Sequence, residues 1–155
     1  MKAVLKKAGK TSAILPLIEP ETVQTKQVAL SQYCFWTGEL VIGGLKGVVK
    51  TEAGWLDGKE VTLVHYDESQ ISQKTLVAEA KKQSCANQVY SGSSLKGYRP
   101  AKISDQKKQI GGTPFAKLKN LTPYQRTKIN ASARSNVSQA KSFLSPRQLD
   151  ELMKS

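Results

Sequence analysis

Residues 48–66 read VVKTEAGWLDGKEVTLVHY, and this stretch decides the fold because it holds two strand-like runs with a tight turn between them. The runs, 48–55 and 60–66, are rich in the β-branched and aromatic residues that favour strands. Between them, Asp57-Gly58 is a strong signal for a two-residue hairpin turn, because such a turn requires positive φ at its central positions. The stretch therefore predicts an antiparallel β-hairpin.

The segments on both sides of the hairpin predict alternating strands and helices. Residues 23–30 are rich in strand formers, and residues 34–45 space their apolar side chains near the helical period. After the hairpin, 72–82 predicts a helix with Ser72 as its N-cap, and 87–90 supplies one more short strand. This is the split βαβ order, so we expect an α+β fold with a ferredoxin-like, two-layer core.

Composition divides the 155 residues into three parts. We expect an irregular N-terminal segment at 1–22, the ferredoxin-like core at 23–90, and a basic, partly helical C-terminal extension at 91–155 that wraps the core. This total length is typical of a single domain.

Two helix starts are predicted in the extension from the same sequence pattern, a capping residue followed by proline. Thr122-Pro123 and Ser145-Pro146 each place a capping residue before a proline, which the first turn of a helix tolerates. At the second start, Gln148 is spaced for a capping box with Ser145.

The net charge of +12 is concentrated in one half of the chain. Residues 1–80 carry nine Lys or Arg and nine Asp or Glu, whereas residues 81–155 carry fifteen and three. Such asymmetry is found in anion-binding modules, and aromatic residues lie among the cations, which is compatible with nucleic acid. The charges are dispersed, however, and no nucleic-acid-binding motif accompanies them. A solvated, loosely packed tail is the simpler explanation.

Several classes of protein are excluded by composition. No apolar run approaches the ~20 residues of a membrane span. Two cysteines argue against a disulfide scaffold, and one histidine without paired cysteines gives no metal site. The apolar cluster near the N-terminus is too short for a signal sequence, so we expect a cytoplasmic protein, or a periplasmic one if a signal precedes this sequence.

Cys34 is the first candidate for a functional residue. It precedes a predicted helix, where free backbone N–H groups and the helix dipole favour the reactive thiolate. Phe35 and Trp36 follow it and would form an apolar cup, and Glu60 begins the strand whose end can reach the same edge of the sheet. Taken alone, a cysteine is more often a small buried side chain and a glutamate a solvated one.

These residues form part of a longer pattern. Residues 34–39, Cys-Phe-Trp-Thr-Gly-Glu, look like the Gly-Cys-Phe-Trp-x-x-Glu signature of the A-type peptide methionine sulfoxide reductases. In register with it, residues 47–55 are similar to that family's Gly-Val…Gly-Tyr strand, and 58–67 to its Gly-His…Tyr-Asp segment. The chain resembles this family over about residues 23–80.

The resemblance implies thiol-dependent reduction of methionine (S)-sulfoxide, free or in proteins, as in protein repair after oxidative stress. Cys34 would attack the sulfoxide sulfur and become a sulfenic acid, while Glu60 would protonate the sulfoxide oxygen. Phe35 and Trp36 would hold the substrate's methyl group, and Trp55 stands beside them where the family has a tyrosine. Thioredoxin or a similar dithiol would restore the thiol, with no metal or organic cofactor.

Cys85 and the departures from the family pattern leave alternatives open. Cys85 is either the resolving thiol or a spare thiol at a helix end. Tyr33 replaces the glycine before the cysteine, Lys59 replaces a histidine, and the loop between the hairpin strands is cut to a turn. The alternative function is therefore a catalytically degenerate, reductase-like domain that binds protein or nucleic acid.

Overall fold

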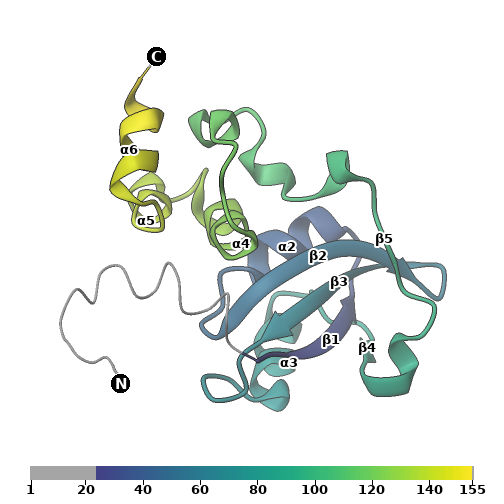
Figure 1. The fold of residues 1–155 in the computed structure, drawn as a ribbon. Coiled ribbons are helices and arrows are strands. Elements are labelled where there is room, and N and C mark those ends of the chain that lie inside the picture. Colours follow the sequence, from purple (N-terminus) through teal and green to yellow (C-terminus); the bar gives the residue numbers. More distant parts are fainter. Residues whose placement is uncertain (1–23, 155) are drawn as a thin grey trace.

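A computed structural model describes residues 24–154, and within them the predicted α+β fold is confirmed (Figure 1). One sheet contains the strands β1 (Lys26–Ser31), β2 (Val48–Leu56), β3 (Lys59–Tyr66), β4 (Val89–Tyr90) and β5 (Arg99–Pro100). The longer helices are α2 (Phe35–Ile42), α3 (Gln73–Lys82), α4 (Pro123–Ser132), α5 (Val137–Lys141) and α6 (Pro146–Met153). The segment expected to be irregular, 1–22, lies outside the described residues.

The strand order is β4-β1-β3-β2-β5, and all neighbouring strands are antiparallel. The first four strands and the helices α2 and α3 reproduce the ferredoxin-like order. At the predicted turn, Asp57 and Gly58 have φ angles of 56° and 72°, and the hairpin pairs Trp55 with Glu60. Strand β5 is added at the outer edge of β2 by the C-terminal half of the chain.

The helix starts follow the predicted caps. Ser72 accepts a hydrogen bond from the Thr75 N–H at 3.1 Å, and both Thr122 and Ser145 form capping boxes with the glutamine three residues later. Helix α2 ends at Ile42 with Gly43 as its C-cap, as expected from the weak helical signal at Gly43-Gly44.

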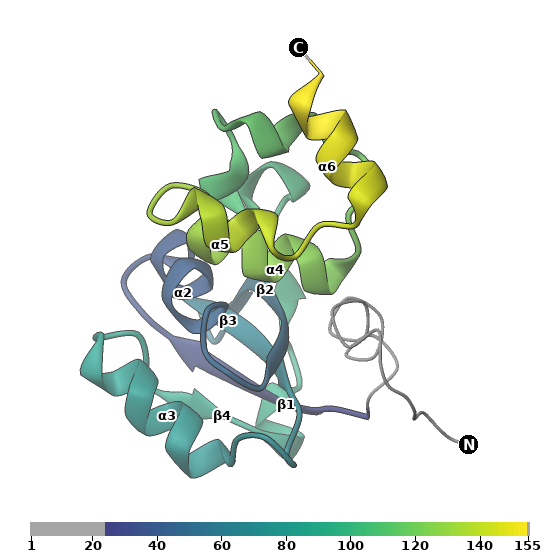
Figure 2. The same cartoon turned by 90° about the vertical axis from the view of Figure 1, so that its left-hand side faces the viewer.

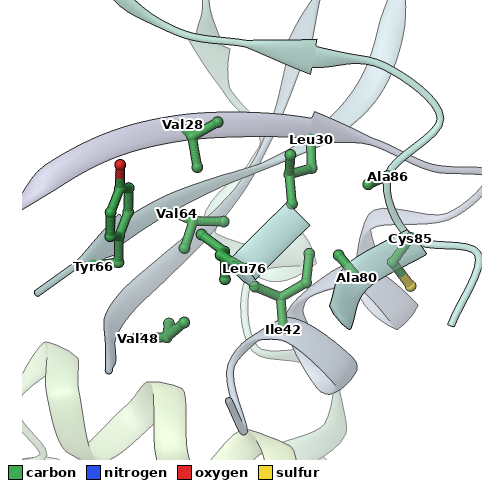
Figure 3. Packing of buried hydrophobic residues seen from close by; sticks show 10 residues of the cluster. All are labelled: Val28, Leu30, Ile42, Val48, Val64, Tyr66, Leu76, Ala80, Cys85 and Ala86. Atoms are coloured by element: carbon green, nitrogen blue, oxygen red, sulfur yellow. The ribbon is translucent and has the colours of Figure 1, made fainter. Parts of the chain in front are cut away.

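The main hydrophobic core lies between one face of the sheet and the helices α2 and α3 (Figure 3). Alternate residues of β1 and β3 face the helices, as the period of a strand requires. The buried members of this cluster are Val28, Leu30, Ile42, Val48, Val64, Tyr66, Leu76, Ala80, Cys85 and Ala86.

The C-terminal half contains a second hydrophobic cluster and contacts the sheet on both sides. The cluster is formed by Ile110, Phe115, Leu118, Ile129, Ala133, Ala140, Leu144 and Leu152. Helix α4 packs against α2 and β2 (Figure 2), while Leu95 and Tyr98 cover the opposite face of the sheet. Within residues 24–154, no helix is both long and apolar enough to cross a bilayer.

Candidate active site

Cys34 occupies the N-cap of helix α2. Its backbone is extended, with φ −142° and ψ 121°, and its carbonyl accepts the first helical hydrogen bond from the Gly38 N–H at 3.0 Å. The thiol makes no capping hydrogen bond and is half-buried. It therefore lies at the positive end of the helix dipole.

Glu60 reaches the same helix end from the start of β3. Its Oε1 accepts a hydrogen bond of 2.9 Å from the Phe35 N–H, the amide directly after Cys34. This bond satisfies one of the four amides that the first turn of a helix leaves without an intrahelical partner. Chain positions 34 and 60 are thus brought together because β1 and β3 are antiparallel, so that Ser31 at the end of β1 pairs with Val61 at the start of β3.

Of the three aromatic residues predicted at the site, Phe35 is buried and the two tryptophans are partly exposed. Phe35 is buried and meets the Trp55 ring edge-on, with ring centroids 5.3 Å apart. Trp55 lies opposite Glu60 in the hairpin, so both side chains are on the helix-covered face of the sheet. Trp36 and Trp55 remain 38% and 39% exposed, which leaves an accessible apolar surface beside Glu60.

A shallow hollow of about 480 Å³ adjoins this surface. Trp55 and Glu60 line it together with Tyr33, Lys59 and the segment at 87–88. The Tyr33 side chain is 95% exposed, so the residue that replaces the family's glycine does not pack over the Cys34 thiol.

Gly38 lets helix α2 approach the sheet closely. A Cβ at this position would lie 2.1 Å from Thr62 Oγ1 and 2.6 Å from Gln32 Nε2, distances that side chains do not tolerate. The sequence pattern included this glycine without assigning it a role. Its role is to set the depth of α2, and thereby the height of Cys34 above β3.

Glu39 anchors the same helix to the C-terminal half of the chain. Its carboxylate is 1% exposed and lies 2.7 Å from Lys107 Nζ, 2.7 Å from the Thr51 hydroxyl and 2.8 Å from the Lys107 N–H. Burial lowers the pKa of Lys107, and the adjacent Glu39 carboxylate opposes that shift. Sequence reasoning missed this pair because its members are 68 residues apart.

Lys108 follows this buried pair and reaches the exposed tryptophan. Its Nζ lies 5.1 Å from the centroid of the Trp36 ring, within the range of a cation–π contact. No local signal in the sequence indicates this contact, since nothing near Lys108 distinguishes it from the other lysines of the extension.

Cys85 lies in the main core, where Figure 3 shows it next to Ala80 and Ala86. Its thiol is buried, and burial raises its pKa. The Gln32 Nε2 donates to the Cys85 carbonyl at 3.2 Å. The backbone of Cys85 is therefore in contact with a residue two positions before Cys34. Both cysteines are free thiols.

Metal ligation finds no support in the part of the chain that the structure describes. No three histidine, cysteine, aspartate or glutamate side chains there are grouped so as to hold an ion.

Comparison with known proteins gives one relationship. The chain is 35% identical over 71 residues to peptide methionine sulfoxide reductase MsrA of Clostridium perfringens, in an alignment that covers 35% of this chain. Two further strains of that species give the same identity, so the three relatives count as one. The alignment spans 45% of the relative's length, and no protein-family model matches. Part of this chain is therefore similar to MsrA.

Proposed function

We propose that the protein is an oxidoreductase that reduces methionine (S)-sulfoxide, free or in proteins, with Cys34 as its nucleophile. The observation that carries this proposal is the hydrogen bond between Glu60 Oε1 and the Phe35 N–H, which holds a carboxyl group beside the residue at the N-cap of α2. A thiol and a carboxyl group at one helix end supply the two groups that sulfoxide reduction needs.

The first step transfers the sulfoxide oxygen. The Cys34 sulfur attacks the sulfoxide sulfur while Glu60 gives a proton to the oxygen. The sulfur–sulfur bond formed in this attack and the S–O bond of the substrate then break as the hydroxyl passes to the Cys34 sulfur, so methionine leaves as the thioether and Cys34 becomes a sulfenic acid. The substrate gains two electrons and the cysteine loses them.

The aromatic residues supply a surface for the apolar end of the substrate. Trp36 and Trp55 are exposed at this site, and Phe35 supports Trp55 from below. Contact of the substrate's methyl group with this surface orients the sulfoxide oxygen toward Glu60, which selects one epimer.

The second stage restores the thiol. A second thiol attacks the sulfenic acid, releases water and forms a disulfide, which a thioredoxin-like dithiol then reduces. Cys85 is the candidate within this chain, and its burial in the main core requires the 84–88 segment to move before the two sulfurs meet. This chemistry uses no metal or organic cofactor.

Reduction of an N-acetyl methionine (S)-sulfoxide amide, with dithiothreitol as reductant, tests the function. We expect turnover by the wild type and none by Cys34→Ser. Lack of turnover by the wild type contradicts the proposal and favours a reductase-like binding module. The Cys85→Ser variant is the matched control, because removal of the Cys85 thiol leaves the oxygen-transfer step at Cys34 intact.

A comparison of the wild type with Cys85→Ser tests whether Cys85 is the resolving thiol. With thioredoxin as reductant, we expect Cys85→Ser to lose most of its turnover while it keeps the rate seen with dithiothreitol. Equal rates with thioredoxin in wild type and Cys85→Ser would remove Cys85 from the cycle.

A further inference from the structure

We infer that the site selects methionine sulfoxide in an acidic context, in which carboxylate side chains flank the sulfoxide. This inference rests on the proposed function and names the substrate class that the same site takes. It follows from the way in which the segment 99–108 brings cations to the rim of the aromatic surface.

Lys108 is the first of these cations. Its amino group lies 5.1 Å from the Trp36 ring and donates to the Ser104 carbonyl at 3.1 Å, and the side chain is exposed. Its place is fixed by its neighbours, because Lys107 is locked onto Glu39 and the Gln109 N–H donates to Asn130 Oδ1 at 2.9 Å. A cation is therefore held over an exposed ring two residues from Cys34.

Arg99 is the second cation, and it lies beside the other exposed tryptophan of the aromatic surface. It lies directly opposite Trp55 in the β2–β5 pair, and side chains of such pairs share one face of the sheet. Trp55 shares that face with Glu60, so Arg99 does too. The two hydrogen bonds of 2.8 Å between the Gln106 amide and the Ala53 backbone hold this segment against β2.

The local balance of charge is positive. The segment 99–108 contains four cations and one acid, Asp105, and one of the cations, Lys107, is neutralised by Glu39. Lys59, in the hollow, is paired with Asp57 at 3.5 Å and adds little. Three cations of the segment thus remain to attract an anionic substrate, and of these Arg99 lies beside Trp55 and Lys108 over Trp36.

An acidic peptide fits these observations better than nucleic acid does. Each of the two cations lies beside one tryptophan of the aromatic surface, Arg99 by Trp55 and Lys108 by Trp36, so the residues that flank a bound methionine side chain would meet them. The basic residues beyond this rim belong to several different elements, and no nucleic-acid-binding motif accompanies them in the sequence.

Two capped pentapeptides that differ only in their flanking residues test the inference, Gly-Asp-Met(O)-Asp-Gly against Gly-Asn-Met(O)-Asn-Gly. With dithiothreitol as reductant, no protein donor competes for the basic rim. At low salt we expect kcat/KM to be about three- to tenfold higher for the aspartate peptide, mainly through KM, because exposed charge pairs contribute modestly. The preference should fall as salt rises toward 0.5 M.

The double variant Arg99→Gln with Lys108→Gln should lose this preference while it still reduces the asparagine peptide. The matched control removes two charges from α6, Arg147→Gln with Lys154→Gln, since Figure 1 shows α6 and β5 at opposite ends of the molecule. This control should keep the preference. Equal kcat/KM for both peptides, or a preference that survives in Arg99→Gln with Lys108→Gln, overturns the inference and leaves the proposed function standing. Failure to reduce either peptide overturns both.

Discussion

At the scale of single residues, Glu60 combines a structural and a chemical role. Its carboxylate accepts the hydrogen bond from the Phe35 N–H, as an N-cap side chain does, and it is also the proton donor of the proposed reaction. The two roles are separable, because glutamine keeps an acceptor oxygen at the same place while it has no acidic proton to transfer.

Glu60→Gln should therefore leave the free energy of unfolding nearly unchanged and lower kcat by roughly 10²–10⁴-fold. Glu60→Ala should lose activity and also about 1 kcal/mol of stability, the usual cost of a lost cap. Urea unfolding and the dithiothreitol-coupled assay measure the two effects. Full kcat in the glutamine variant would leave Glu60 with the structural role alone.

Gly38 tests whether the depth of α2 controls the site. A Cβ there meets Thr62 Oγ1 at 2.1 Å, so Gly38→Ala should push the helix away from β3 and cost about 1–3 kcal/mol of stability. Gly111→Ala is the control, since its Cβ would lie 3.5 Å from its nearest neighbour, the Lys108 carbonyl oxygen, at an ordinary φ of −58°. Comparable unfolding midpoints for the two variants would contradict the close approach.

At the scale of elements, α2 is fixed at both ends and in its middle. Glu60 caps its first turn, and Gly38 seats it on the sheet. Beyond its last turn, Lys128 of α4 donates hydrogen bonds of 3.0 Å and 2.8 Å to the carbonyls of Gly43 and Leu45. A cation at a helix C-terminus also complements the helix dipole.

Lys128 makes stability depend on pH in an identifiable window. Burial lowers its pKa to about 8, against roughly 10.4 in an unfolded chain. Between these values the unfolded state binds more protons, so stability rises with pH. Relative to Lys128→Met, the wild type should gain on the order of 3 kcal/mol at most between pH 8 and pH 10.4. Urea unfolding at pH 7, 8, 9 and 10 checks this, and a constant difference between the proteins would refute it.

The elements that form the fold were predictable because their signals are local. The turn at Asp57-Gly58 and the cap at Ser72 lie within a few residues of the structures they start. The antiparallel order that follows from them also accounts for Glu60 reaching the residue after Cys34. By contrast, the contacts of Lys108 and Arg99 depend on where a chain of little regular structure runs, which neither period nor propensity encodes.

At the scale of the whole molecule, the two hydrophobic clusters are joined by buried polar contacts. The Thr51 N–H donates to the Thr127 hydroxyl at 3.1 Å, and Glu39 binds Lys107. These links tie the segment that carries Lys108 to the helix that carries Cys34. The basic half of the chain and the candidate active site of the first half therefore meet at one helix, so they belong to one structural unit.

The Glu39–Lys107 pair should accordingly couple stability with substrate preference. Lys107→Met leaves a buried carboxylate without its cation and should cost about 3–5 kcal/mol, whereas Glu39→Gln with Lys107→Met should cost less than the sum of the two single variants. Urea unfolding of the four proteins gives the coupling. In any variant that stays folded, the displaced 107–108 segment should also weaken the preference for the aspartate peptide. Additive costs with an unchanged preference would show that the pair does not join the two halves.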